Sequence, residues 1–385
     1  MKTIVVNGAN GYVASNFVAD LLKNGYKVIA LVRPNNRLTA EERMHSVLSD
    51  ISEYEKTDTG NLSVYTYSLL EKNFAISKKR LENIFGTDVD YFHFAASLKY
   101  DKKSANEIFA TNIDGVKNSV LVFNKYTSAS SRFFYIGTAY SCGKFSGVFE
   151  EKFYKNKSIS AFRNYYELSK RFAENIIKQS IEKQKLNGHV IRLSQVVGNH
   201  KTGVTKTDYG IFDFAKRVSV LARRYPDEVV RVHVDPDSTQ NLIPVDTVVK
   251  YLNQTVKLPE VPVIMNFVSK KSIKNSFIIN TLNDLLPITM IPLKKIERDN
   301  MNSIERLISI GMSFTESYVE TNIIFDTKKR GEIIPFSEEF EITEESVLKM
   351  LKYYTRNYSE NKKVIFCRKT FTYGPGSTLS YNHHQ

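Results

Sequence analysis

Short apolar runs alternate with amphipathic stretches along residues 1–200. Apolar runs of about four to eight residues are typical of buried strands, whereas apolar positions three or four apart indicate helices that cover them. We expect strands at residues 3–6, 27–32, 62–67, 90–94, 132–136 and 189–193. We expect helices at residues 12–23, 40–51, 77–84, 104–126 and 162–184. The alternation predicts an α/β fold of the Rossmann type, a doubly wound parallel sheet with right-handed crossovers.

The alternation is looser beyond Gly198. Helices are expected at 209–225, 246–255, 274–284, 300–310 and 343–358, and short extended segments at 241–244, 261–267 and 321–325. We interpret residues 1–200 as the sheet domain and residues 201–359 as a smaller substrate-binding region, from which parts of 241–270 return to the sheet. Residues 360–385 lack a helical or strand period and are expected to form a mobile tail.

The composition, 42% hydrophobic and 25% charged over 385 residues, is that of an ordinary globular protein. Its apolar runs fall short of the ~18–20 residues that cross a bilayer, and no charged leader precedes the first strand. The two cysteines, Cys142 and Cys367, are too few for a disulfide framework, and neither they nor the seven histidines have the spacing of metal ligands. These features predict a cytoplasmic protein without a membrane span or a metal site.

The charge balance, 54 basic against 41 acidic residues, leaves a formal net charge of +13. Such a surplus favours acidic partners such as a carrier protein, a nucleotide or a coenzyme. The basic residues are scattered rather than interleaved with aromatic residues, so no nucleic-acid partner is predicted. A generally solvated basic surface is the alternative explanation of the same surplus.

A glycine-rich turn at residues 7–14 follows the first predicted strand. Gly8 lets the chain turn tightly, Gly11 lets a pyrophosphate approach the next helix N-terminus, and the small Ala14 lets that helix approach the sheet. Between a strand and a helix, this pattern indicates nucleotide binding rather than an ordinary turn. The expected contacts of the turn are Gly8, Asn10, Gly11, Tyr12 and Val13.

The end of the second strand distinguishes between the two nicotinamide nucleotides. An NAD site would place an acidic residue there to bind the ribose hydroxyls, whereas this chain has Arg33. Arginine matches a phosphate through forked, charge-assisted hydrogen bonds. We therefore predict NADP, with Arg33 and also Arg43 at its 2′-phosphate; a solvated surface arginine is the alternative at both positions.

Candidate catalytic residues follow the fifth predicted strand. Tyr166 and Lys170 lie four residues apart on a predicted helix, so their side chains point the same way. A tyrosine has a pKa of ~10, and a neighbouring ammonium is expected to pull that pKa toward the working range. Thr138, 28 residues before Tyr166, falls at the carboxyl end of the sheet, where its hydroxyl could donate to a substrate carbonyl oxygen.

In this order of motifs the chain resembles the extended short-chain dehydrogenase/reductases. More closely, it resembles the branch of thioester reductase domains, carboxylic acid reductases and male-sterility-type fatty acyl-CoA reductases. The resemblance covers about residues 1–355, and its matching segments are 8–14, 31–33, 73–77, 92–96, 111–115, 137–140, 147–151, 164–170, 192–203, 235–237 and 241–246. The segments 198–203 and 243–246 are the most specific to this branch.

The resemblance implies an NADPH-dependent reductase of an acyl thioester, carried by a carrier protein or coenzyme A, which forms an aldehyde and then, if reduction continues, an alcohol. It assigns Thr138, Tyr166 and Lys170 to catalysis, with Asn112 in support. The expected cofactor contacts beyond the glycine turn are Arg33, Arg43, Ala95, Asn112, Tyr166 and Lys170. Tyr67 and Ser68 depart from the family pattern after the third strand, where a small and an acidic residue are usual, which leaves the adenine-side contacts open.

Three other functions stay open on the sequence alone. The same residues could reduce a free ketone or aldehyde, or serve a sugar-nucleotide epimerase or dehydratase, although Arg33 weighs against the latter. A non-catalytic nucleotide-binding protein is disfavoured by the intact Thr138, Tyr166 and Lys170 set. Cys142 near the predicted site is expected to be a buried thiol rather than a nucleophile.

Overall fold

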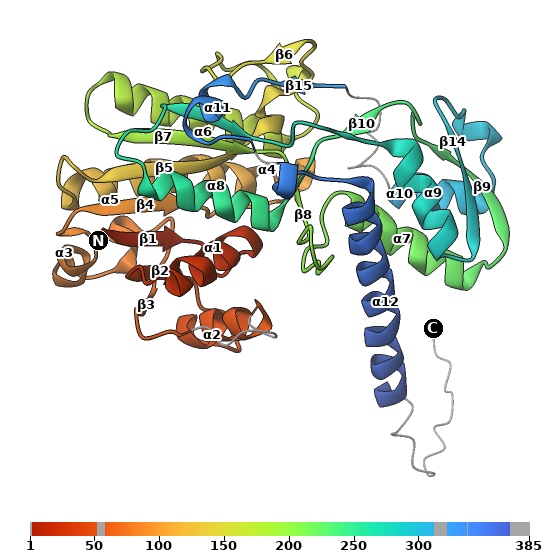
Figure 1. Ribbon diagram of the computed structural model, residues 1–385, viewed down its shortest axis with the longest axis horizontal. Coiled ribbons are helices and arrows are strands. Elements are labelled where there is room, and N and C mark those ends of the chain that lie inside the picture. Colours follow the sequence, from red (N-terminus) through yellow and green to blue (C-terminus); the bar gives the residue numbers. More distant parts are fainter. Residues whose placement is uncertain (1, 52–57, 312–321, 337, 370–385) are drawn as a thin grey trace, which may run out of the picture.

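A seven-stranded parallel sheet forms the larger part of the computed structural model, which describes residues 2–51, 58–311, 322–336 and 338–369 (Figure 1). The strand order is β12-β7-β5-β4-β1-β2-β3. The strands are β1 (Thr3–Asn7), β2 (Val28–Val32), β3 (Leu62–Thr66), β4 (Val89–His93), β5 (Arg132–Thr138), β7 (Gly188–Leu193) and β12 (Ile264–Phe267). The order reverses beside β1, as it does in a doubly wound fold, so the predicted fold class is confirmed.

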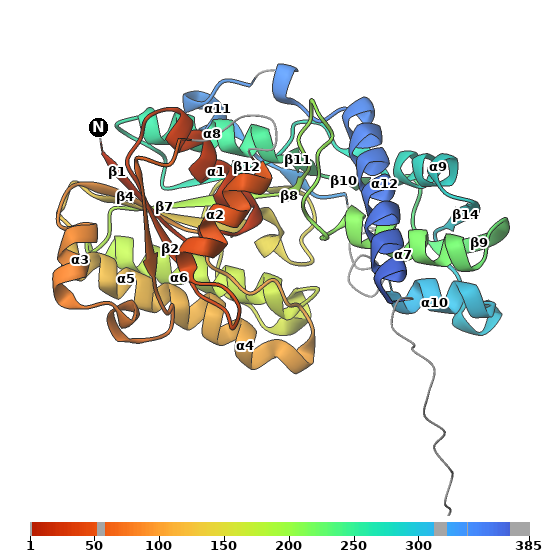
Figure 2. The same cartoon turned by 90° about the horizontal axis from the view of Figure 1, so that it is seen from below.

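Helices cover both faces of the sheet (Figure 2). On one face lie α1 (Tyr12–Lys23), α2 (Ala40–Ile51) and α8 (Val245–Lys257); on the other lie α3 (Lys78–Phe85), α4 (Ala105–Phe109), α5 (Gly115–Tyr126) and α6 (Tyr165–Glu182). Successive residues of β1 explain this double cover, because Ile4 and Val6 join the hydrophobic core under α1 whereas Val5 joins the core under α5.

The helix expected over residues 104–126 is interrupted. A 3-10 turn at Lys102–Ser104 leads into α4, and a π-helical segment at Ala110–Asp114 separates α4 from α5. The helix expected from residue 162 begins at Tyr165, because the side chain of Asn164 accepts a hydrogen bond from the Glu167 amide at 2.9 Å and caps it.

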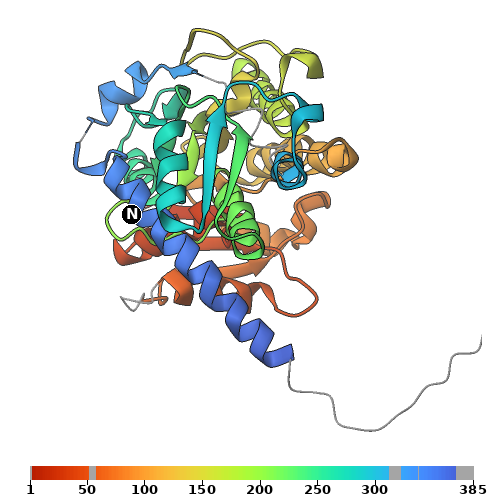
Figure 3. The ribbon, with the colours of Figure 1, turned by 90° about the vertical axis from the view of Figure 1, so that its right-hand side faces the viewer.

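A second hydrophobic core lies beside the carboxyl edge of the sheet. It is formed by α7 (Ile211–Arg224), β9 (Glu228–His233), α9 (Asn275–Leu285), β14 (Ile288–Leu293), α10 (Ser303–Gly311) and α12 (Glu344–Lys369). Figure 3 shows α12, in blue, running diagonally across this part of the molecule. The helix continues to Lys369, beyond the start of the irregular tail predicted from residue 360; residues 370–385 lie outside the described part of the chain.

The chain returns to the sheet after building part of this second core. β11 (Leu242–Pro244) pairs in parallel with β8 (Gln195–Val197), α8 then packs on α1, and β12 pairs with β7 as the edge strand. Other short elements include β6 (Val148–Phe149), β10 (Thr239–Gln240), β13 (Ile273–Lys274), β15 (Ile324–Phe325) and α11 (Lys328–Ile333). No helix in the described ranges is long and apolar enough to span a membrane.

Candidate active site

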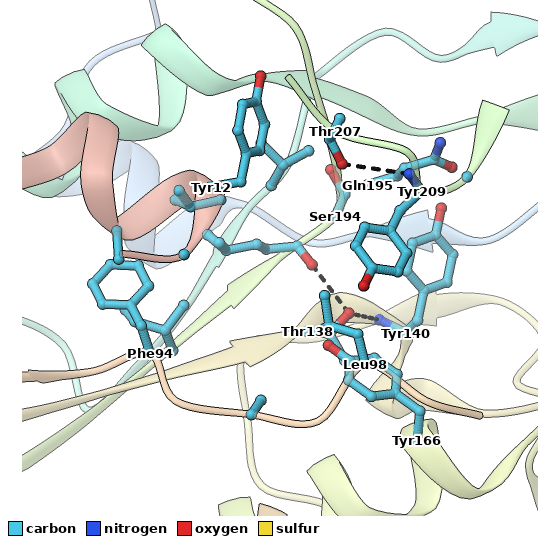
Figure 4. Close-up of a pocket in the computed structure, with 18 of the residues that line it drawn as sticks. Tyr12, Phe94, Leu98, Thr138, Tyr140, Tyr166, Ser194, Gln195, Thr207 and Tyr209 are labelled. Carbon is cyan, nitrogen blue, oxygen red and sulfur yellow. Dashed lines mark hydrogen bonds between the residues drawn. The ribbon is translucent and has the colours of Figure 1, made fainter. Parts of the chain in front are cut away.

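A cavity of about 620 Å³ lies at the carboxyl ends of β1, β4, β5 and β7 and extends to the second core (Figure 4). Parallel strands end in loops at this edge, which is where ligands bind in open α/β sheets. Most of the residues singled out by the sequence line this one cavity: Gly8, Asn10, Gly11, Tyr12, Val13, Arg33, Arg43, Ala95, Thr138, Tyr166 and Lys170.

The glycine turn leaves the N-terminus of α1 open to the cavity. Gly8 has a φ of +59°, and a Cβ at this position would lie 2.9 Å from the main-chain nitrogen of Ala95, so only glycine fits. Asn7 fixes the neighbouring loop, because its Oδ1 accepts hydrogen bonds from the amides of Phe94 at 2.8 Å and Ala95 at 3.0 Å. Gly11, at the N-cap of α1, has no side chain to cap the first amides of the helix, and such amides suit an anion such as a pyrophosphate.

Two arginines stand at one end of the cavity. Arg33 is exposed directly after β2, and the guanidinium of Arg43, on α2, donates to the main-chain oxygen of Arg33. Tyr67, one of the departures from the family pattern, is buried in the same wall. Burial raises the pKa of Tyr67 to about 12 although the nearby Arg33 lowers it, so this phenol is neutral.

Thr138, Tyr166 and Lys170 come together in the middle of the cavity. The Thr138 hydroxyl donates to the carbonyl of Leu193 at 3.2 Å and accepts from the amide of Tyr140 at 3.2 Å. Figure 4 shows the Tyr166 side chain extending toward Thr138. The Lys170 Nζ donates to the carbonyl of Ile136 at 3.1 Å and lies 5.8 Å from the centre of the Tyr166 ring.

The pKa of Tyr166 shifts in the direction opposite to the predicted one. Burial raises it, and the Glu167 carboxylate and Tyr209 raise it further, so the side chain is a neutral phenol. Burial lowers the pKa of Lys170 to about 8, opposed by Glu174. Burial is thus the largest cause of both pKa shifts, and it keeps the proton on the Tyr166 hydroxyl.

Asn112 lies behind the cavity wall and does not line it. Its side chain accepts from the Ser97 amide at 2.7 Å and donates to the Ser97 carbonyl at 3.1 Å and to Ser169 Oγ at 2.9 Å. These bonds join the loop after β4 to helix α6. The structure thus places Asn112 between these two segments and outside the lining of the cavity.

A buried ion pair that the sequence analysis did not single out supports the catalytic helix. Glu174, one turn after Lys170, pairs with Arg192 on β7 at 2.7 Å, and both residues are fully buried. Glu174 also accepts from Ser141 Oγ at 2.7 Å, in the turn directly after Thr138. The sequence could have predicted that Glu174 supports Lys170, because residues four apart lie on the same face of α6.

The residues of the far wall of the cavity were not predicted from the sequence either. Ser194 and Gln195 follow β7, and a rule that searches the carboxyl end of every strand would have found them. The remaining wall comes from the second core and carries no such signal; its members are Thr207, Tyr209, Gly210, Ile211, Phe214, Val234, Gln240, Asn275, Ile278 and Ile279. Cys142 is buried, and burial raises the pKa of its thiol to about 12, which does not suit a nucleophile.

The model of the male sterility protein family, an NAD-binding family, matches residues 6–252. The chain belongs to this family. The predicted kinship with the extended short-chain dehydrogenase/reductases of the thioester reductase and male sterility branch is therefore confirmed. The match contains the glycine turn, Thr138, Tyr166 and Lys170, and it ends within α8.

Curated proteins similar to this male sterility family member include reductases. The L-2-aminoadipate reductase large subunit of Eremothecium gossypii is 28% identical over 265 residues, which are 64% of this chain and 18% of that protein. The NRPS-like oxidoreductase fscA of Fusarium equiseti is 23% identical over 69% of this chain and 24% of its own length. Fatty acyl-CoA reductase 2 of Mus musculus is 27% identical over 148 residues, 36% of this chain and 28% of that protein. The chain thus spans less than a third of each of these relatives.

Solved structures with the fold of this male sterility family member include two from peptide synthetase pathways. The terminal R domain of the myxalamid PKS-NRPS pathway superposes with a TM-score of 0.74 at 16% identity, covering 93% of this chain and 91% of that one. A thiolation-reductase di-domain from an archaeal non-ribosomal peptide synthetase gives 0.74 at 20% identity over 95% of this chain and 76% of that one. At these identities the likeness establishes the fold.

Proposed function

We propose that the chain is an NADPH-dependent reductase of an acyl thioester, held on a carrier protein or on coenzyme A, and that it releases an aldehyde. One observation carries the proposal: a single cavity joins an open helix N-terminus and two arginines to Thr138, Tyr166 and Lys170. Relatives named as aminoadipate and fatty acyl-CoA reductases support the reaction class.

The residues fit a phosphorylated nicotinamide dinucleotide. A pyrophosphate would bind at the N-terminus of α1, which the glycine turn places at the cavity. This turn requires glycine at position 8, because a Cβ there would meet the Ala95 backbone. Arg33 and Arg43 would hold the 2′-phosphate, because guanidinium groups match its oxygens. Lys170 would hold the nicotinamide ribose. When bound, the cofactor supplies a hydride to the carbonyl carbon of the thioester.

The chain's own residues then stabilise and protonate the negative charge that develops on the carbonyl oxygen. Thr138 exchanges its hydrogen bond to the Leu193 carbonyl for one to this oxygen, and Tyr166 donates a second. Tyr166 gives up its proton as the oxygen becomes a hydroxyl, and the Lys170 ammonium stabilises the phenolate left behind. The resulting thiohemiacetal loses its thiol and becomes the aldehyde.

The test is NADPH consumption measured in parallel against acyl-CoA thioesters, acyl-carrier thioesters, free aldehydes and nucleotide sugars, with Tyr166→Phe as the inactive control. We expect thioesters to be reduced. Turnover of free carbonyl compounds alone, or conversion of nucleotide sugars, would replace the proposal with the carbonyl reductase or epimerase function.

Ionic strength gives a second readout of the same proposal. With a net charge of +13, the protein attracts anionic carriers and coenzyme A, and salt weakens that attraction over a screening length of ~8–10 Å. We expect kcat/KM for the thioester to fall several-fold between low salt and ~0.3 M salt at saturating NADPH, while kcat/KM for the free aldehyde stays nearly constant. The same response for both substrates would remove the argument for an anionic acyl donor.

A further inference from the structure

Two polar side chains in the cavity wall lack a hydrogen-bond partner. They are Ser194, through its Oγ, and Gln195, through its Nε2, and both atoms are shielded from solvent. Ser194 is only 5% exposed. A hydroxyl or amide that is buried without a partner costs free energy, and a ligand that supplies an acceptor there removes that cost.

The two residues lie close to the reacting centre. Ser194 follows Leu193, which is the direct partner of Thr138 in the β5–β7 register and whose carbonyl takes the Thr138 hydroxyl at 3.2 Å. Figure 4 shows Ser194 and Gln195 on the wall opposite Tyr166. Their backbones are fixed, because the Ser194 amide donates to Phe267 at 3.1 Å and the Gln195 amide to Asn241 at 3.3 Å.

Gly210 makes room for the Gln195 amide. Its φ is +62°, and a Cβ at this position would lie 1.8 Å from Gln195 Nε2. The amide therefore occupies space that only a glycine leaves open. Beyond Gly210 the wall carries the apolar side chains of Ile211, Phe214 and Ile278. It also contains Gln240 and Asn275, whose side chains are hydrogen-bonded to each other at 3.1 Å. The cavity thus places the donors of Ser194 and Gln195 beside the reacting centre, and apolar side chains form much of the wall further away.

We propose that Ser194 and Gln195 form a polar subsite: when an acyl group enters the cavity, rotation of the two side chains brings these shielded atoms to the cavity surface, where they donate hydrogen bonds to an oxygen close to the reacting carbonyl. This inference rests on the proposed function and narrows its substrate class. The substrate is an acyl thioester with an amide, keto or hydroxyl oxygen near the thioester and an apolar group beyond it. A plain alkyl chain would cover both donors without satisfying them.

The test compares two coenzyme A thioesters of equal chain length, N-acetylglycyl-CoA and pentanoyl-CoA, at saturating NADPH. We expect kcat/KM for N-acetylglycyl-CoA to be about tenfold higher or more. Ser194→Ala and Gln195→Leu should each reduce that ratio severalfold by slowing N-acetylglycyl-CoA more than pentanoyl-CoA.

Two matched controls lie outside the cavity. Ser219→Ala removes a buried hydroxyl from α7, where it donates to the Ala215 carbonyl at 2.7 Å. Gln254→Leu, on α8, removes another amide that has a buried atom without a partner. Both variants should keep the ratio of the unaltered protein, which separates the subsite from a general effect of such substitutions.

Calorimetric binding of the two thioesters in the presence of oxidised NADP gives a readout without turnover. Preferential binding of N-acetylglycyl-CoA would support the subsite even if no thioester consumed NADPH, a result that would overturn only the proposed reaction. Equal binding of the two thioesters would overturn the subsite. The subsite would also be overturned if Ser194→Ala and Gln195→Leu raised the KM for NADPH and left the ratio of the two kcat/KM values unchanged. Ser194 and Gln195 would then bind the nicotinamide carboxamide instead of the acyl group.

Discussion

Arg33, proposed to bind the 2′-phosphate, should determine whether the protein prefers NADPH or NADH. The substitution Arg33→Ala removes a guanidinium from the cavity end without disturbing the core, because the side chain is exposed beyond β2. A charge-assisted hydrogen bond contributes about 1.5–3 kcal/mol, and exposure to solvent favours the lower end of that range. A loss of about 1.5 kcal/mol corresponds to roughly tenfold weaker NADPH binding. NADH lacks the 2′-phosphate, so its affinity should not change.

The assay is a fluorescence titration of the reduced nicotinamide, with NADPH and NADH measured on the same protein. The matched control is Arg37→Ala, an exposed arginine of the same loop that does not line the cavity. The unaltered protein should bind NADPH at least ~10-fold more tightly than NADH, and Arg33→Ala should remove most of that difference. Equal affinities in the unaltered protein, or a preference that survives in Arg33→Ala, would refute the reasoning.

Three further predictions concern the catalytic centre and the glycine turn. Tyr166→Phe keeps the ring but has no proton to give, so kcat should fall by orders of magnitude with NADPH affinity almost unchanged; near-normal turnover would place the proton donor elsewhere. The Lys170 ammonium, with a pKa of about 8, is present below that pH and lost above it, so kcat should decline above about pH 8. Lys170→Arg should move this decline to higher pH, and a profile that is flat to pH 10 would contradict the role. In Gly8→Ala the added Cβ would collide with the Ala95 backbone. Gly25→Ala is the control, because Gly25 also has a positive φ but a Cβ there would have open space around it. Urea unfolding should therefore show that Gly8→Ala lowers the free energy of unfolding by at least ~1 kcal/mol more than Gly25→Ala does. Equal decreases would contradict the predicted clash.

The sheet was predictable from the sequence because each buried strand is a short apolar run between turn residues. Predicted and observed limits of α1 and α2 coincide, and most strands differ by one or two residues. The break at Ala110–Asp114 was not predictable, because the π segment is held by bonds from Asn112 to Ser97 and to Ser169, which are distant in sequence.

The candidate site likewise contains residues that the sequence predicts and residues that it does not. Gly8, Thr138, Tyr166 and Lys170 belong to local motifs whose spacing is set by one strand, one turn or one helix. The far wall has no local pattern. Ile278 faces the cavity only because α9 packs in the second core, so its place depends on tertiary contacts that periodicity does not encode.

The return of the chain to its sheet has a consequence for synthesis on the ribosome. β7 ends at Leu193, but its outer neighbour β12 ends at Phe267, so an unfinished chain carries β7 as an open edge. At about 5–20 residues per second, the ribosome needs several seconds to make the missing part. An unpaired, apolar strand edge invites pairing with other chains during this time. Chains that stop before Phe267 should therefore aggregate even though they contain Thr138, Tyr166 and Lys170.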